Sequence, residues 1–143
     1  MGTYYPPLGF HFKVEFLTIP GEFEFQSVSG LSTEMKTEEY AEGGENRFSH
    51  KLPVRTSFPN LVLKRGMKVN SALALWCRSA IEQFVILPSD IIISLLNEEH
   101  EPLTVWYVAH AYPVKWSVSD FNAEENKLVI ESIELAYNHF NVI

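Results

Sequence analysis

The residue types that most often carry chemistry are present in this chain, but their spacing does not bring them together. The five histidines (His11, His50, His100, His110 and His139) lie in different parts of the sequence, without the HxH or HxxxH separations typical of metal ligands. They would form a site only if the fold happened to gather them. Solvated or hydrogen-bonded histidines are the simpler interpretation, and we expect no metal and no cofactor.

Nucleophiles and phosphate-binding loops are equally hard to find. The single cysteine, Cys77, falls on the apolar face of an expected helix, which indicates a buried thiol rather than a nucleophile. The run Glu98–Glu101 could bind a hard cation weakly, but a solvated hairpin tip explains it better. Gly43-Gly44 lacks the strand and helix that flank a phosphate-binding loop, and no motif of a hydrolase or zinc protease occurs. We therefore expect no enzymatic activity.

The most unusual feature is a charge-segregated arm over residues 38–60. Its first part is acidic, and the stretch from Arg47 to Lys68 contains only basic charges, although the chain as a whole has a net charge of −7. Glycines and prolines punctuate the segment, so we expect an extended structure with little regular strand. Such an arm suggests contact with other copies, because each copy carries both the patch and its complement. The alternative is that the acidic and basic halves neutralise each other across a hairpin within one chain. The basic residues of the stretch from Arg47 to Lys68 are Arg47, Lys51, Arg55, Lys64, Arg65 and Lys68.

The bulk composition restricts the function further. A chain of 143 residues with 46% hydrophobic content predicts one globular domain, 1–143. A pI near 5.2 argues against general binding to nucleic acid or anionic membranes, although the arm could still hold a strand with Phe48 or Phe58 stacking on bases. The N-terminus lacks the regions of a signal peptide, so we expect synthesis in a reducing cytoplasm.

Apolar–polar alternation predicts about seven strands, mostly antiparallel, around one helix. We expect a first hairpin over residues 10–25, turning at Pro20-Gly21, and a strand break at Tyr112-Pro113. The last strand, 128–137, changes its apolar phase midway, which predicts a bulge near Glu131-Ser132. Further strands are expected over residues 31–40, 61–63, 91–96, 103–111 and 114–118.

One helix is expected over residues 71–85, capped by Asn70 or Ser71. Its apolar residues recur at helical spacing and should pack against the sheet. The polar residues Arg78, Glu82 and Gln83 should form an exposed outer face. The apolar stripe consists of Leu73, Trp76, Cys77, Ala80, Ile81 and Phe84.

Several sequence strings resemble the tail-tube proteins of contractile injection systems, which include contractile phages and extracellular phage-tail-like particles. They are FxSVSGL at 25–31, TEEYxEGG at 37–44, HKLPVRT at 50–56, LVLKRG at 61–66, LLNEEHEP at 95–102, HAYPVKW at 110–116 and SDFNAEEN at 119–126. Each string alone is weak, but their order and spacing are fairly specific and extend over nearly the whole chain.

This resemblance implies an antiparallel β-sandwich or barrel-like protomer with one helix and a long arm. Six copies would close into a ring, and the rings would stack into an inner tube within a sheath, on a baseplate and spike. The arm would contact an adjacent ring of the same protein or of a paralogue. Its implied contact residues are Glu38, Glu39, Glu42, Gly43, Gly44, Glu45, Asn46, Arg47, Phe48, His50, Lys51, Pro53 and Arg55.

Two questions stay open on the sequence alone. The long basic arm favours the ring that starts the tube at the baseplate over the main tube ring, but one sequence does not settle this. A small β-barrel that binds an apolar ligand between its sheets is the alternative function. The resemblance also implies assembly into a phage tail or a particle released from the cell, with no specific nucleic acid or membrane partner.

Overall fold

The computed structural model describes residues 10–41, 49–68, 71–119 and 129–143, and gives the backbone alone for residues 36, 40–41 and 49–55. Within these ranges the chain is mainly β with one helix. The elements are β1 (His11–Phe16), β2 (Ile19–Phe25), β3 (Ser27–Ser29), β4 (Glu34–Ala41), β5 (Ser49–Ser57), β6 (Leu61–Gly66), α1 (Ala72–Gln83), β7 (Ser89–Leu96), β8 (Pro102–Val118), β9 (Ile130–Ala136) and β10 (His139–Val142).

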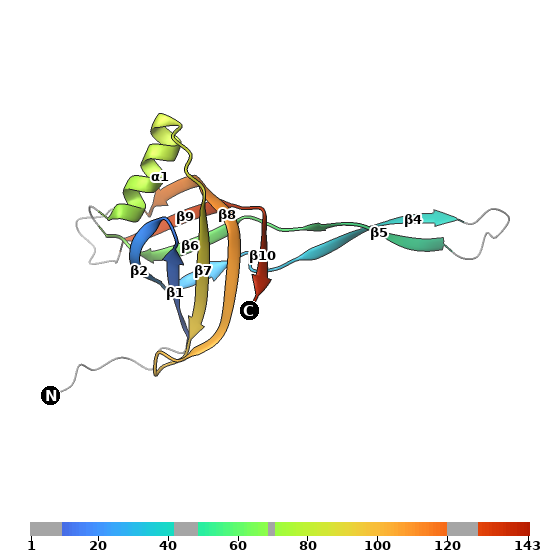
Figure 1. The fold of residues 1–143 in the computed structure, drawn as a ribbon, viewed down its shortest axis with the longest axis horizontal. Coiled ribbons are helices and arrows are strands. Elements are labelled where there is room, and N and C mark those ends of the chain that lie inside the picture. The colour runs from blue at the N-terminus through green and yellow to red at the C-terminus, as the bar shows by residue number, and fades with distance from the viewer. Residues whose placement is uncertain (1–9, 42–48, 69–70, 120–128) are drawn as a thin grey trace.

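The body is an eight-stranded sheet bent into two layers. The strand order is β2-β1-β7-β8-β9-β6-β3, with β10 also paired to β8, and all the described pairs are antiparallel. The first half of the 17-residue β8 pairs with β7 and β10, and its second half pairs with β9. Only Gln26 separates β2 from β3, so the two outer strands also join at a corner. Figure 1 shows the resulting barrel-like body.

Two predicted chain breaks are bulges within strands. The first hairpin turns at Leu17-Thr18, and Pro20-Gly21 lie inside β2 at a register shift, where Gly21 adopts φ +106°. The expected break at Tyr112-Pro113 is a second shift, and β8 continues through it. Proline is tolerated at such points because a bulge leaves the backbone N–H out of the ladder.

The bulge predicted at Glu131-Ser132 is absent. Strand β9 pairs with β6 in continuous register from Ile130 to Leu135, and alternate residues of β9 are buried throughout. The apparent change of phase arises because Glu131, a charged residue, occupies a core position. Its apolar neighbour Ile130 points to the other face, where it is only half-buried.

The core lies between the two layers and under the helix. Its members come from nearly every strand of the body and are at most 9% exposed. The aromatic rings of Phe16 and Trp76 meet edge to face, with centroids 5.3 Å apart. The core residues are Val14, Phe16, Ile19, Phe25, Leu61, Leu63, Leu73, Trp76, Cys77, Ile91, Ile93, Val108, Ala111, Ile133 and Leu135.

Helix α1 is two residues shorter at its C-terminus than expected. Ser71 caps its start by accepting a hydrogen bond from the Ala74 N–H at 3.0 Å. At its end Phe84 is left-handed (φ 56°), and the N–H groups of Phe84 and Val85 both donate to Ser79 O, that of Val85 at 3.0 Å, which closes the helix with a left-handed turn. This turn swings Phe84 away from the sheet, where it is 82% exposed.

The burial of Phe84 and Ile81 was therefore predicted wrongly. Ile81 lies about 80° around the helix from Leu73, at the margin of the apolar stripe, and stays 46% exposed. Leu73, Trp76, Cys77 and Ala80 are buried as expected. Among the described residues, no helix has the length and apolar character needed to cross a membrane.

Candidate assembly surfaces

Strands β4 and β5 form a separate two-stranded hairpin that projects from the body (Figure 1). The expectation of an irregular arm was wrong, because the two strands pair from Glu34↔Ser57 to Ala41↔Ser49. Pro53 is accommodated beside a register shift between Lys36 and Thr37. Proline and weak apolar–polar alternation suggested an irregular segment. A ribbon with no buried face has the same weak pattern, so the sequence did not distinguish the two.

The register shows how the charges of the hairpin are arranged. Glu39 lies opposite Lys51, an attractive position, whereas Lys36 lies opposite Arg55, which places two bases across from one another. The described register therefore does not place an acid of β4 opposite every base of β5. A two-stranded ribbon is at best marginally stable alone, so this projection gains little from its own pairing.

The expected contact residues fall into three groups. Glu38 and Glu39 lie on β4 and are exposed. The backbone of β5 carries the second group, His50, Lys51, Pro53 and Arg55. The third group, Glu42, Gly43, Gly44, Glu45, Asn46, Arg47 and Phe48, lies outside the described residues.

The outer face of α1 is exposed, as the sequence predicted. Arg78, Glu82 and Gln83 all face solvent, with Arg78 Nε 3.4 Å from Glu82 Oε1. Next to them lies a helix-end apolar segment, Phe84–Leu87, whose four side chains are 39–82% exposed. Four consecutive exposed apolar residues are unusual on a monomer and mark a contact surface.

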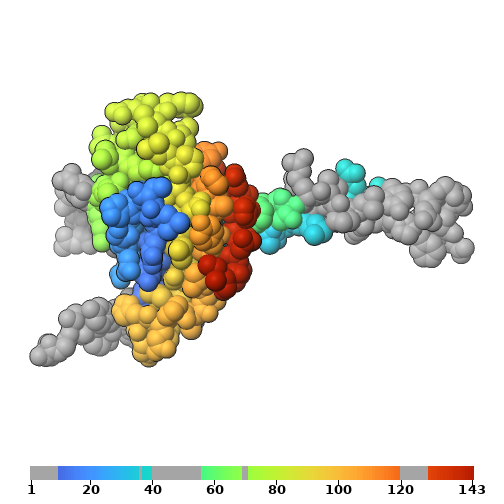
Figure 2. Space-filling view, viewed as in Figure 1, coloured from blue at the N-terminus to red at the C-terminus, as the bar shows by residue number. Residues whose placement is uncertain are grey.

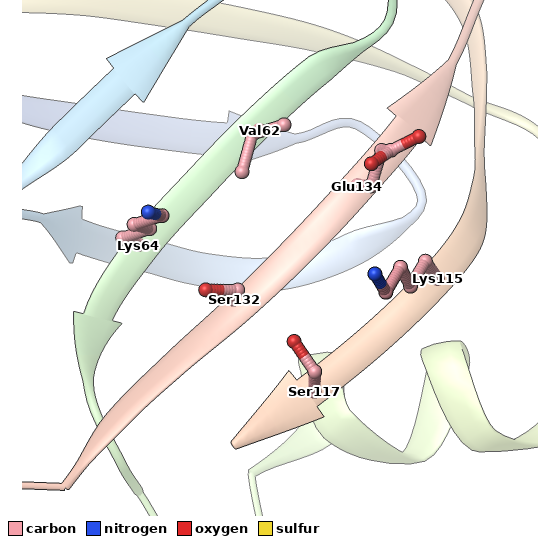
Figure 3. Close-up of a pocket in the computed structure, with 6 residues that line it drawn as sticks. All are labelled: Val62, Lys64, Lys115, Ser117, Ser132 and Glu134. Carbon is pink, nitrogen blue, oxygen red and sulfur yellow. The ribbon is translucent and has the colours of Figure 1, made fainter. Parts of the chain in front are cut away.

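A polar face covers the outside of the β6, β9 and β8 layer. Figure 3 shows side chains from all three strands projecting from this face around a shallow groove of about 200 Å³. Asn60 Nδ2 donates to Glu134 Oε2 at 3.0 Å beside it. Strand alternation produces this face, since Leu61 and Leu63 point into the core while Val62 and Lys64 point out. The lining residues are Val62, Lys64, Lys115, Ser117, Ser132 and Glu134.

Sequence reasoning missed a buried ion pair between Arg65 and Glu131. Arg65 Nε lies 2.6 Å from Glu131 Oε1, and the two side chains are 2% and 0% exposed. The second carboxylate oxygen accepts from Trp116 Nε1 at 2.8 Å, and Arg65 Nη2 donates to the helix-capping Ser71 at 3.0 Å. The guanidinium also lies 5.2 Å from the Phe25 ring centre. The ion pair thus joins β6, β9, β8, β2 and the start of α1. In the sequence, the only indication of this pair was the interrupted apolar pattern of β9.

Cys77 lies close to this pair and is buried. Burial, with a smaller effect from the nearby Glu131 carboxylate, raises the pKa of the Cys77 thiol to about 12. The thiolate form is therefore scarce at neutral pH, as expected for a packed rather than a nucleophilic cysteine.

The structure brings together two groups of titratable residues on the surface. His11 Nε2 lies 2.9 Å from His100 Nδ1. Asp90 accepts hydrogen bonds from the Tyr107 hydroxyl and from the His110 N–H at 2.9 Å. The Tyr107 hydrogen bond is the largest cause that lowers the Asp90 pKa, and the same bond raises the pKa of Tyr107. Within the described ranges, no group of three or more His, Cys, Asp or Glu residues could hold a metal ion.

Comparison with solved structures relates the whole chain to phage-tail-like particles. A chain in the baseplate of the anti-feeding prophage matches with 32% identity and a TM-score of 0.80, over 100% of this chain and 97% of that one. A chain in the cap that terminates the tube of that particle matches with 29% identity and a TM-score of 0.78, over 100% and 94%.

A third match comes from the sheath–tube complex of an extracellular contractile injection system, with 28% identity, a TM-score of 0.76 and coverage of 96% and 90%. Hcp1 from Flavobacterium johnsoniae shares the fold, with 12% identity, a TM-score of 0.61 and coverage of 92% and 94%.

No protein with curated information matches significantly in sequence. The family model described as T4-like virus tail tube protein gp19 matches residues 8–141. The chain therefore belongs to the tail tube protein family of contractile injection systems.

Proposed function

We propose that this tail tube protein closes into hexameric rings that stack into the inner conduit of a phage-tail-like particle, without catalytic activity of its own. The observation that carries the proposal is the projecting β4–β5 hairpin, which pairs with no strand of the body among the described residues. A ring of identical subunits uses heterologous contacts that close on themselves. Each ring would then present six hairpins to its neighbour, and weak contacts repeated six times add up to a stable junction.

In this arrangement the hairpin lies between rings. The residues assigned to the contact are those of the arm, with Arg47, Lys51 and Arg55 meeting acidic residues of the adjacent ring. Exposed charge pairs each contribute only about 0–1 kcal/mol, so the junction should depend on their number. Tube growth should weaken as added salt shortens the screening length below ~8–10 Å.

The test is a charge-reversed variant, Arg47→Glu, Lys51→Glu and Arg55→Glu. We expect a folded protein that forms rings but no tubes by negative-stain microscopy. A matched control, Lys13→Glu, Lys68→Glu and Arg78→Glu, makes the same change in net charge on exposed or half-exposed residues outside the hairpin and should still form tubes. Normal tubes from the hairpin variant would disprove the inter-ring role. A wild-type protein that stays monomeric at every concentration, alone and with tube partners, would disprove the ring.

The polar face on β6, β9 and β8 is assigned to the wall of the conduit. Its support is the contrast between two surfaces, since this face carries Lys64, Lys115 and Glu134, whereas the helix-end segment is apolar. A polar wall lets cargo and water pass without adhesion. The opposite side of the same layer is occupied by the core, where Leu61, Leu63 and Ile133 are fully buried, which argues against the ligand-carrier alternative.

Single-cysteine labelling tests this wall, because the native Cys77 thiol is buried and gives little background. A Ser132→Cys variant should react with a small maleimide both as free subunits and in tubes. A maleimide attached to a large protein should label it only in free subunits. Glu82→Cys, on the outer helix face, should accept both reagents in both states. Labelling of position 132 by the large reagent in long tubes would place that residue outside the conduit.

The outer face of α1, with the helix-end apolar segment, is assigned to the sheath. One similar chain comes from a sheath–tube complex, and Phe84–Leu87 is a surface that assembly would cover. Hydroxyl-radical footprinting should show these residues oxidised in bare tubes and protected once the sheath is added. Equal oxidation in both samples would remove the sheath from this face.

We further assign the ring to the baseplate end of the tube. The sequence identity is 32% to a chain in a baseplate structure and 28% to a chain in a sheath–tube complex. The basic hairpin would also suit contact with a ring made of another protein. Gold labelling of a tagged chain in purified particles should mark one end. Label along the full length would make it the main tube protein.

A further inference from the structure

His11 and His100 are 89 residues apart in sequence, but one ring nitrogen of each lies within hydrogen-bond distance of the other. His11 lies on β1, and His100 lies in the tip that joins β7 to β8. Nε2 of His11 and Nδ1 of His100 are 2.9 Å apart, and the ring centres are 4.7 Å apart with the planes at 77°. His11 is half-buried and His100 is exposed, so the meeting point is open to small ions.

The tip backbone holds His100 in place. His100 has φ 62°, and its N–H donates to Asn97 O at 3.0 Å. The Asn97 side-chain oxygen accepts from the N–H groups of Glu99 and Glu101, both at 2.9 Å. On the other side, His11 pairs with Leu96 at the end of β7. The two rings are therefore held together by backbone structure and not only by their mutual hydrogen bond.

Paired imidazole nitrogens at this spacing suit a divalent transition metal. Imidazole binds Cu²⁺, Ni²⁺ and Zn²⁺ well. With metal–nitrogen bonds of about 2.0–2.1 Å, a nitrogen separation of 2.9 Å corresponds to an angle of about 90° at the metal. A right angle fits the tetragonal geometry of Cu²⁺ and Ni²⁺, whereas tetrahedral Zn²⁺ needs the nitrogens to move apart to about 3.3 Å.

We propose that His11 and His100 form a chelating site for a divalent metal ion of the Cu²⁺ or Ni²⁺ type. The hydrogen atom now shared between the rings moves to the free nitrogen of its own ring, so two neutral imidazoles each offer a lone pair and no proton is lost. The described residues supply two ligands, and water completes the coordination. Glu98, Glu99 and Glu101 on the same tip add negative potential that attracts a cation. A bound metal clamps the β7–β8 tip to β1.

The experiment titrates CuSO₄ and NiSO₄ into the purified full-length chain, followed by calorimetry and by the visible absorption of bound Cu²⁺. We expect one site per chain. His11→Gln and His100→Asn should each weaken it at least about tenfold, and asparagine suits the positive φ at position 100. The control His139→Gln, an exposed histidine outside the pair, should change affinity less than about twofold.

A thermal melt provides a second readout that does not depend on spectroscopy. Excess Cu²⁺ should raise the unfolding midpoint of the wild type and of His139→Gln, but not of the two pair variants, because a ligand stabilises only a fold that binds it. Equal binding by the wild type and both pair variants, or no binding by the wild type, would show that His11 and His100 are a hydrogen-bonded pair only.

Discussion

The body and the β4–β5 hairpin of this protein contrast in how their strands are stabilised. The strands of the body belong to one bent sheet, and most of them bury side chains between its two layers, where Val14, Leu63 and Ile133 have no exposed surface. Among the described residues, β4 pairs with β5 alone, and Met35 remains 61% exposed. Apolar burial is the main favourable contribution to folding, so we expect the body to be stable by itself. We expect the hairpin, by contrast, to depend on contacts with other subunits.

The largest expected effect lies in the body, at its buried ion pair. Glu131→Ala should lower the free energy of unfolding by about 3–5 kcal/mol, because it leaves the Arg65 charge buried without its partner. It also removes the acceptor of the Trp116 N–H. Denaturant unfolding followed by tryptophan fluorescence measures the loss.

The double variant Arg65→Met with Glu131→Leu is the control for this prediction. It removes both charges and keeps the volume, so it should be more stable than Glu131→Ala alone. If Glu131→Ala lowers the free energy of unfolding by less than about 1 kcal/mol, the ion pair is accessible to water. The body would then be less stable by itself than its buried area indicates.

A second test compares the buried and exposed faces of α1. Trp76→Ala should cost about 3–5 kcal/mol by opening a cavity against Phe16 and removing the hydrogen bond from Trp76 Nε1 to Leu87 O. Glu82→Ala, on the outer face, should cost under ~0.5 kcal/mol. Equal losses in urea unfolding would contradict the assignment of the two faces.

The junction between the two regions is the third place to test. Gly30 follows β3, where the chain leaves the body, and has φ +96°. A Cβ at Gly30 would lie 2.3 Å from the backbone oxygen of Asn60, immediately before β6, where the chain returns to the body. Gly30→Ala should therefore cost about 1–3 kcal/mol through strain and displacement of that strand.

Gly21→Ala is the matched control for the junction, because Gly21 also has positive φ (+106°) but its Cβ would meet nothing within 4 Å. It should cost less than Gly30→Ala, and the difference measures the steric clash alone. Thermal melts of both variants are sufficient. Identical losses would mean that the close approach to Asn60 relaxes freely.

The sequence predicted the two regions with unequal success, for physical reasons. Periodicity placed the longer strands of the body and the helix because a buried face imposes a pattern, as at Val14 and Phe16 in β1. It did not predict the short strands β3 and β10, neither of which has a buried residue. It failed at Glu131, where a charge replaces an apolar residue at a core position, and at Phe84, where a left-handed residue ends the helix. For the arm, a hairpin within one chain was only the second interpretation, since a ribbon without a buried face leaves no burial pattern that shows its pairing.

The pairs that join distant segments could not be predicted at all. His11 and His100 meet because β1 pairs with β7 in one particular register, and Arg65 reaches Glu131 because β6 pairs with β9. No local sequence feature around these residues specifies either strand register. The charges of the hairpin were visible in the sequence, but their alignment, with Glu39 opposite Lys51, required the structure.

The smallest effect on stability is expected in the hairpin, and it tests the contrast directly. Glu39→Ala changes an exposed side chain and should alter the free energy of unfolding by less than ~0.5 kcal/mol. In the free chain, amide hydrogens of β4 and β5 should exchange much faster than those of β7 and β8, because local opening of the hairpin exposes little apolar surface. In assembled tubes the hairpin amides should become protected, while those of β7 change little. Hydrogen exchange with mass spectrometry separates these cases, since a hairpin as protected as β7 in the free chain would be stabilised by its own chain and not by its partners.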